Sequence, residues 1–211
     1  RQELYTMDVV VAEKGVSSDS KKVRFGVREL SYELEVCFPD DSIRRVEYRP
    51  TVMGQGEPIF DNINRKYIEG GMCMPRLKKN VSSDILVPAP DKAMQHYMVI
   101  KVNGKRIFCK GGNWGMDDAM KRVSREHLEP YFRLHKEANF NMIRNWTGES
   151  TEENFYELCD EYGIYVYDEA NIESHGMYYN LSRGGTLGNH PEWLKPHMDR
   201  TINMYERNKN H

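Results

Sequence analysis

The chain has 211 residues, of which 39% are hydrophobic and 29% are charged, and its formal net charge is -2. This length allows one large domain or two small ones, and the composition is typical of a globular protein. The near-neutral balance gives no basic surface for nucleic acid, and no apolar run reaches the length of a membrane span. We therefore expect neither a nucleic-acid partner nor a membrane partner.

The cysteines are widely spaced and form no CxxC pair: Cys37, Cys73, Cys109 and Cys159. We interpret them as free, mostly buried thiols rather than as a zinc site or a disulfide framework. No spacing in the chain predicts a metal site, and the sequence leaves cofactors open. HExxH, P-loop and GxSxG motifs are absent, so zinc-protease, phosphate-loop and serine-hydrolase functions lack support.

The first quarter of the chain is predicted to be all-β. Residues 3–11 and 23–28 are predicted strands joined by a polar turn. Residues 32–37 and 43–48 form a second pair, with two aspartates at the hairpin turn between them.

Residues 49–96 carry several prolines and glycines and show no sustained period. A connection this long without regular structure is uncommon in a compact domain. We interpret it as an irregular linker or insertion, a functional loop, or strands that the pattern does not reveal.

From residue 98 onward the pattern changes to alternating strands and helices. An Asn103-Gly104 turn joins predicted strands at 98–102 and 105–110. Three βα units are then expected from residue 107 onward, too few to close an eight-stranded barrel. The expected elements after the hairpin are a helix capped by Ser124, a strand at 141–146, a helix with a Ser150–Glu153 capping box and a Gly163 C-cap, a strand at 164–168, and a helix from Pro191 to about Asn208. Repeated βα alternation predicts a parallel sheet.

Polar residues gather where two of these strands end. Asp168, Glu169, Glu173 and His175 follow the strand at 164–168. They could bind a metal, act as acid and base, or hydrogen-bond a polar ligand. The alternative is that they are solvated loop residues, since loops are polar in general.

Arg144 and Trp146 are predicted to share one face of the preceding strand, because side chains alternate along a strand. Arg144 could clamp a carboxylate or hydroxyl group, and Trp146 could stack on a sugar ring. Alternatively, Arg144 pairs with a neighbouring carboxylate and Trp146 packs in the core. The residues alone leave both possibilities open.

Several groups of residues, taken in order, resemble glycoside hydrolase family 2. They are Arg24 to Glu29, Val102 to Gly104, Lys110 to Trp114, Asn141 to Arg144, and Leu158 to Gly163. The family includes β-galactosidases, β-mannosidases, β-glucuronidases and exo-β-glucosaminidases. Residues 111–163 look more like the mannosidase and glucosaminidase branch, whereas 168–177 and 204–211 look like β-galactosidase. This mixture leaves the sugar open.

The resemblance implies an α/β fold, part of a (β/α)8 TIM barrel with its first three βα units, preceded by strands of an immunoglobulin-like β-sandwich. It implies three regions. Residues 1–48 would be the end of the sandwich, 49–96 an irregular linker or insertion, and 97–211 the N-terminal part of the barrel.

The resemblance also implies a retaining mechanism that uses two glutamates. Neither matches a residue of this chain, so we expect no catalytic residue here and no activity of the 211 residues by themselves. Sugar-binding roles are implied for His175, Arg144, Trp146, Asn113, Trp114 and Asp168.

We therefore expect an incomplete part of an exo-acting, β-galactosidase-like glycoside hydrolase, whose partner is a β-linked oligosaccharide or glycoside. The alternative is a non-catalytic carbohydrate-binding or scaffold fragment. A third hypothesis, an unrelated α/β protein, is favoured if residues 107–168 contain no parallel strands. The oligomeric state and the compartment are left open by the sequence.

Overall fold

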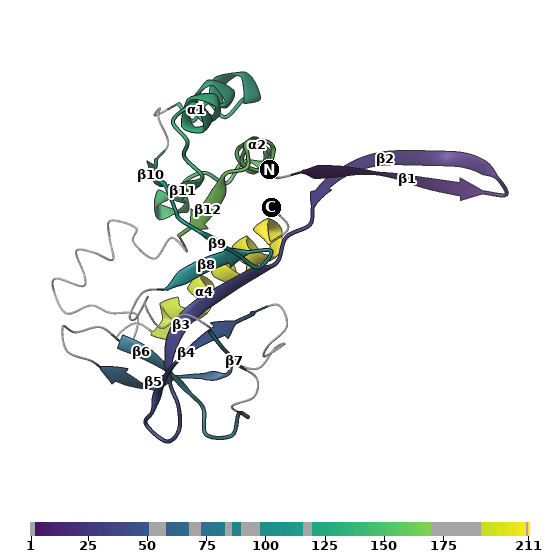
Figure 1. The fold of residues 1–211 in the computed structure, drawn as a ribbon. Helices are drawn as coiled ribbons and strands as arrows, with labels where there is room; N and C mark the ends of the chain where they lie inside the picture. The colour runs from purple at the N-terminus through teal and green to yellow at the C-terminus, as the bar shows by residue number, and fades with distance from the viewer. Residues whose placement is uncertain are drawn as a thin grey trace. The chain divides into compact units, whose positions relative to one another are not determined.

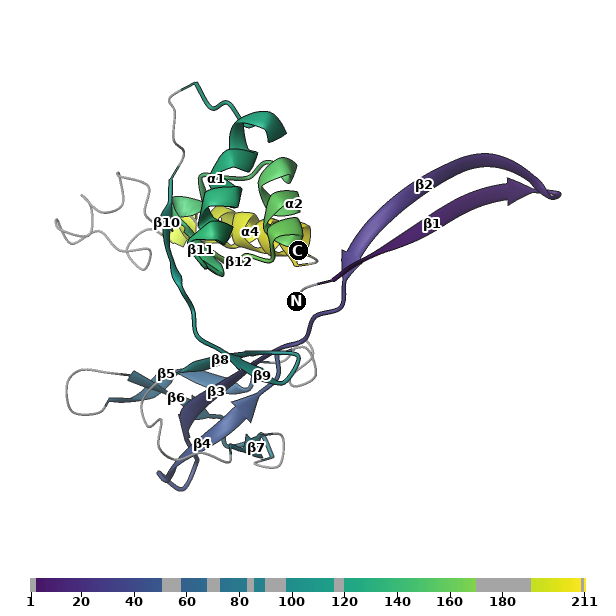
Figure 2. The ribbon, with the colours of Figure 1, turned by 45° about the horizontal axis from the view of Figure 1, so that its top comes forward.

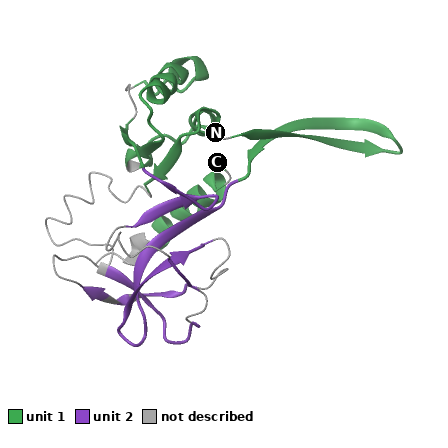
Figure 3. Cartoon of the chain, viewed as in Figure 1, with its two compact units in different colours: residues 1–27, 109–211 green, residues 28–108 purple. Residues whose placement is uncertain are grey.

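The structure, a computed structural model, describes residues 3–50, 58–67, 73–82, 86–89, 98–115, 120–169, 191–209 and 211. The chain divides into two compact units (Figure 3). The first unit is Arg1–Val27 with Cys109–His211, and the second unit is Arg28–Phe108. These bounds differ from the expected boundaries at 48 and 96, because Leu30–Glu33 pairs with Val99–Val102 and so joins the two ends of the second unit.

A long two-stranded ribbon opens the first unit: β1 (Leu4–Glu13) pairs antiparallel with β2 (Val16–Gly26) (Figure 1). Lys14 and Gly15 at the turn have φ values of 50° and 81°, as the type I′ hairpin turn requires. The predicted polar turn between residues 11 and 23 is present but shorter, because residues 16–22 belong to β2. Most residues of both strands are exposed, so residues 16–22 needed no apolar alternation and gave no strand signal.

The second unit is a β-sheet built on two hairpins that the sequence predicts. Its strands are β3 (Leu30–Cys37), β4 (Ile43–Tyr48), β5 (Phe60–Tyr67), β6 (Cys73–Leu77), β7 (Val87–Pro88), β8 (Val99–Val102) and β9 (Lys105–Ile107). The order is β5-β6-β3-β4-β7, and β8 pairs with both β3 and β9. The β3–β4 and β8–β9 hairpins are confirmed, and Asn103 and Gly104 both have positive φ.

Of the possibilities left open for residues 49–96, strands that the pattern did not reveal are present, because β5, β6 and β7 lie in this range. Their sequence signal is weak for physical reasons. Pro75 lies in β6, which meets β3 through a single residue pair, and Pro88 lies in the edge strand β7, where proline costs little. The ladder between β5 and β6 also shifts register between Asp61 and Lys66, which breaks the alternation of side chains.

Three short parallel strands form the sheet of the first unit. They are β10 (Gly111–Trp114), β11 (Met142–Asn145) and β12 (Tyr165–Asp168), in the order β10-β11-β12. The predicted βα alternation is confirmed. The first strand is not at 107–110 as expected but at Gly111, where a Cβ atom would lie 1.7 Å from the Met142 carbonyl oxygen. Only glycine allows the two backbones this approach.

Two helices connect these strands, and a third follows them: α1 (Arg125–Glu137), α2 (Glu153–Tyr162) and α4 (Pro191–Asn208). Figure 2 shows α1 and α2 side by side over β11 and β12. Ser124 caps α1 by accepting a hydrogen bond from the His127 amide at 3.4 Å, and Gly163 ends α2 in the left-handed conformation. The start of α4 at Pro191 is confirmed as well.

A shared core packs α1 and α2 against the sheet. Its buried residues are Trp114, Leu128, Phe132, Ile143, Phe155, Tyr156, Leu158, Cys159 and Ile164. Both helices contribute one face to this core, α1 through Leu128 and Phe132, and α2 through Phe155, Leu158 and Cys159. No helix in the described part of the chain is both long and apolar enough to cross a bilayer.

The predicted capping box of α2 is wrong. The helix begins one residue after Glu152, whose side chain makes no capping hydrogen bond. Ser150 is 1% exposed, and its hydroxyl accepts a hydrogen bond from the Trp114 indole N–H at 3.0 Å. The Ser150 hydroxyl, which the local spacing assigned to the helix cap, therefore bonds instead to Trp114, 36 residues away in the chain.

Candidate functional site

In the parallel sheet, the last two residues of each strand align with those of the neighbouring strands and so form two rows of residues across the sheet. Asn113, Arg144 and Tyr167 lie side by side, and the next residues, Trp114, Asn145 and Asp168, form the second row. Because side chains alternate along a strand, the two rows project from opposite faces of the sheet. The predicted site residues therefore divide between the two faces.

The row with Trp114 faces the helices. Trp114 is 9% exposed, and its ring lies 5.2 Å from Phe132 and 5.4 Å from Phe155. Its indole N–H donates a hydrogen bond to the Ser150 hydroxyl. The structure thus gives Trp114 a packing role, and the sugar contact implied for it stays a prediction.

Asp168 lies on the same helix-facing side, within a hydrogen-bond network. Its Oδ1 accepts from the Asn145 side-chain amide at 2.7 Å. Its Oδ2 accepts from the Tyr156 hydroxyl at 2.8 Å and from the Asn208 side-chain amide at 2.9 Å. Burial, followed by the adjacent Asp168 carboxylate, raises the pKa of Tyr156 above its ordinary value. The phenol is therefore a hydrogen-bond donor at neutral pH.

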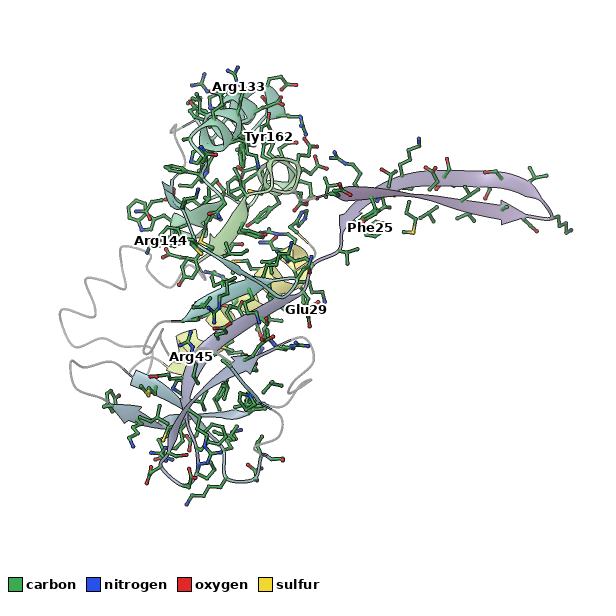
Figure 4. All side chains as sticks on the ribbon, viewed as in Figure 1. Phe25, Glu29, Arg45, Arg133, Arg144 and Tyr162 are labelled. Atoms are coloured by element: carbon green, nitrogen blue, oxygen red, sulfur yellow. The ribbon has the colours of Figure 1, made fainter. Side chains whose placement is uncertain are left out.

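Arg144 organises the opposite face (Figure 4). Its Nε donates to Glu169 Oε1 at 2.6 Å, and its Nη2 pairs with the same oxygen. Its Nη1 donates to Asn113 Oδ1 at 3.3 Å. Side chains from β10, from β11 and from the residue after β12 thus meet at the carboxyl edge of the sheet. Of the two possibilities for Arg144, the ion pair with a neighbouring carboxylate is observed.

Tyr167 is a member of this row that the sequence reasoning did not select. It lies next to Arg144 in the register and is 58% exposed. The alternation within residues 164–168 contained the signal, because Tyr167 and Asp168 must project from opposite faces. Glu169 was in the predicted polar cluster but was not assigned a sugar contact.

Trp146 does not continue the strand as expected. The strand β11 ends at Asn145, and Trp146 begins a short 3-10 helix, η2 (Trp146–Gly148). The Trp146 side chain is 43% exposed, and a Cβ atom on Gly115 would lie 3.8 Å from its Cε3. The ring therefore lies beside the end of β10, partly open to solvent.

His175 and Glu173 lie outside the described residues. Among the residues that the structure does describe, no group of three or more His, Cys, Asp or Glu side chains is arranged to hold a metal ion. The described groups at this edge are a guanidinium, a carboxylate, an amide and exposed aromatic rings.

Parallel strands alternating with helices, with polar side chains at the carboxyl edge of the sheet, are features that (β/α) barrels share with doubly wound sheets. The family comparison decides between them. The chain belongs to glycoside hydrolase family 2: the family model described as "Glycosyl hydrolases family 2, TIM barrel domain" matches residues 94–211. This membership, together with the parallel strands at 111–168, overturns the hypothesis of an unrelated α/β protein.

Curated relatives agree with this membership. A β-galactosidase of Priestia megaterium is 39% identical over 121 residues, which are 54% of this chain and 11% of that protein. A β-galactosidase of Halalkalibacterium halodurans is 38% identical over 119 residues, 54% of this chain and 12% of that protein. A mannosylglycoprotein endo-β-mannosidase of Lilium longiflorum is 43% identical over 72 residues, 34% of this chain and 8% of that protein. The chain thus spans about a tenth of the length of these relatives.

Proposed function

We propose that the first unit forms one wall of the sugar-binding site of a retaining, exo-acting β-glycosidase, with a terminal β-galactoside as the first candidate substrate. The observation that carries this proposal is the group formed by Arg144, Asn113 and Glu169 at the carboxyl edge of three parallel strands. Active sites of (β/α)8 barrels are built at this edge. The β-galactosidases among the relatives support the choice of sugar.

The side chains at this edge have the chemistry that a sugar requires. The Arg144 side chain is 41% exposed, and its bond to Asn113 is long at 3.3 Å. A sugar hydroxyl can therefore compete for the guanidinium and for the amide. The 43% exposed ring of Trp146 offers a flat apolar surface for the C–H face of a pyranose, as aromatic rings do in many binding sites.

Three further residues, His175, Trp114 and Asp168, are given other roles in the proposal. His175 is proposed as a sugar contact on the strength of the family resemblance. Trp114 and Asp168 are proposed to support the site from the helix-facing side, since their polar atoms are already taken up by protein partners.

We further propose that the 211 residues bind a sugar without hydrolysing it. A retaining glycosidase needs a nucleophile and a general acid about 5–5.5 Å apart, flanking the glycosidic bond. The neighbouring carboxylates lie on opposite faces of the sheet, since Asp168 bonds to Asn145 on the helix-facing side and Glu169 bonds to Arg144 on the other side. Both therefore already accept hydrogen bonds from protein donors. Neither has the arrangement of an acid that protonates a leaving group.

The assignment of residue ranges to domains also belongs to the proposal. We propose that residues 1–48 belong to the end of an immunoglobulin-like sandwich and residues 97–211 to the barrel. Residues 49–96 are proposed as a linker or insertion between them, whose strands β5, β6 and β7 extend the sheet of β3 and β4. The antiparallel pair β3–β4, with Val36 and Val46 in a buried core, supports the sandwich assignment. The family match over residues 94–211 supports the barrel assignment.

Calorimetric titration with four methyl β-glycosides tests the proposal: galactoside, mannoside, glucosaminide and glucuronide. We expect the galactoside to bind most tightly, and Arg144→Gln to weaken that binding by about tenfold or more, because a hydrogen bond to a charged group contributes about 1.5–3 kcal/mol. The control is Arg133→Gln, an exposed residue of α1. No binding of any of the four sugars, or equal affinity of wild type and Arg144→Gln, contradicts the proposal.

The same protein should leave the corresponding 4-nitrophenyl β-glycosides intact. Release of nitrophenol by the purified 211-residue chain contradicts the proposed lack of hydrolysis, provided that the Arg144→Gln variant prepared in parallel loses it.

A further inference from the structure

The side chains that donate hydrogen bonds to Asp168 also bond to one another or to the backbone. The Asn145 side-chain amide donates both to Asp168 Oδ1 at 2.7 Å and to the Ser150 carbonyl at 2.8 Å. The Asn208 amide donates both to Asp168 Oδ2 at 2.9 Å and to the Tyr156 hydroxyl oxygen at 2.8 Å. The Tyr156 hydroxyl can in turn donate to Asp168. Each side-chain amide therefore uses both of its hydrogens, and three donors reach one carboxylate.

The donors come from three separate elements of the first unit. Asn145 is the last residue of β11, Tyr156 lies in the middle of α2, and Asn208 is the last residue of α4. Asn145 is 0% exposed and Tyr156 is 3% exposed. Buried polar networks that are fully satisfied hold their elements in one arrangement, because breaking any bond leaves an unpaired buried group.

The network is directly continuous with the sugar-facing group through the backbone. Asn145 follows Arg144, and Asp168 precedes Glu169. Holding Asn145 and Asp168 together at 2.7 Å on one face fixes the separation of Arg144 and Glu169, whose Nε and Oε1 atoms lie 2.6 Å apart.

We infer that Asp168 is a positioning residue: by binding Asn145, Tyr156 and Asn208, it holds the ends of β11 and β12 so that Arg144 stays paired with Glu169 at the sugar-facing edge. The importance of that edge rests on the proposed function, but the pairing itself does not. Asn208, which lies 40 residues further along the chain than Asp168, extends the same control to the end of α4.

The Arg144 Nε–Hε signal in a proton–nitrogen correlation spectrum of the labelled 211-residue protein tests this inference. Arg144→Lys identifies the signal by removing it, and Glu169→Gln gives its position when the ion pair is lost. We expect Asp168→Asn and Asn208→Ala to move the signal toward its position in Glu169→Gln. The matched control Asp199→Asn, on the exposed side of α4, should leave it in place.

The Trp114 indole signal reports whether each variant is folded, because that nitrogen is bonded to Ser150 in the core. If Asp168→Asn fails to fold, Asn208→Ala and Tyr156→Phe decide, since each removes a single donor. An unmoved Arg144 signal in the folded variants overturns the inference and leaves Asp168 with a purely stabilising role. If the Arg144 signal moves in Asp168→Asn but the wild-type protein binds no sugar, the proposed function is overturned and this inference stands.

Discussion

Phe132 is the side chain on which the packing of α1 depends. It is 0% exposed, and its ring lies 5.2 Å from Trp114, 5.6 Å from Phe155 and 6.2 Å from Tyr162. It therefore contacts β10 and α2 at once. Arrangements of this kind gain from aromatic geometry as well as from the area removed from water.

Phe132→Ala should destabilise the first unit by about 3–5 kcal/mol, because the surrounding rings close the cavity only in part. Leu134→Ala on the same helix is the control. Leu134 is 56% exposed, so its loss should change stability by no more than about 0.5 kcal/mol. All three tryptophans of the chain lie in residues 109–211, so the midpoint of urea unfolding followed by tryptophan fluorescence reports this unit alone. Equal midpoints for the two variants contradict the assignment of the core.

At the scale of elements, Glu161 joins α1 and α2 of the first unit. Its carboxylate accepts a hydrogen bond from Arg125 Nη1 at 3.2 Å and also pairs with Nη2, and Arg24 Nη1 donates to it at 2.5 Å. The Arg125 hydrogen bond is the larger cause that lowers the pKa of Glu161 below 4.5, and Arg24 adds to it. The contact joins α2 to α1 and to β2.

Glu161→Gln should destabilise the first unit at pH 7 by about 1 kcal/mol or less, as expected for partly exposed ion pairs. The lowered pKa means that this contribution is fully present above pH 4.5 and is lost as the pH falls through the lowered value. The difference between wild type and variant should therefore shrink below pH 4.5, as measured by urea unfolding at a series of pH values. A difference that stays constant from pH 7 to pH 3 rules out the ion pair as its source.

Elements with local signals were predictable from the sequence. The caps at Ser124 and Gly163 and the turn at Asn103-Gly104 depend on residues within one or two turns of the chain. The strand at Gly111 and the role of Ser150 were not, because they are set by Met142 and by Trp114, far away in the sequence.

The candidate site divides in the same way. The sequence predicted that polar side chains would gather at the ends of two strands, and Arg144 and Glu169 do meet there. The alternation within residues 164–168 separates Asp168 from Tyr167. The sequence could not predict the hydrogen bonds of Asp168, because the donors Tyr156 and Asn208 come from elements whose packing no local pattern records.

At the scale of the whole molecule, the second unit has what an independent domain needs. Its core, centred on Val36, Val46 and Leu77, lies entirely within Arg28–Phe108. Its two ends are held together, since the Glu29 amide donates to Asn103 Oδ1 at 2.8 Å and the Asn103 amide donates to the Glu29 carbonyl at 2.9 Å. A separate core and closely spaced ends are typical of domains that can fold by themselves.

Residues 28–108 produced by themselves should therefore fold into a β-structured protein that unfolds cooperatively, as measured by circular dichroism during heating. Asn103→Ala should lower the unfolding midpoint, because the Glu29 amide loses its side-chain acceptor and Asn103 adopts positive φ, which alanine disfavours. A spectrum of disordered chain for residues 28–108 would show that the second unit depends on the rest of the molecule.

The central claim is that a sugar binds at the edge where Arg144 projects and not on the face covered by helices. Titration of methyl β-D-galactopyranoside into the nitrogen-labelled protein tests it most directly. We expect the Arg144 Nε–Hε and Trp146 indole signals to shift with added sugar, while the Trp114 indole signal, buried and bonded to Ser150, stays in place. Unchanged Arg144 and Trp146 signals at high sugar concentration, or a Trp114 shift as large as theirs, would contradict it.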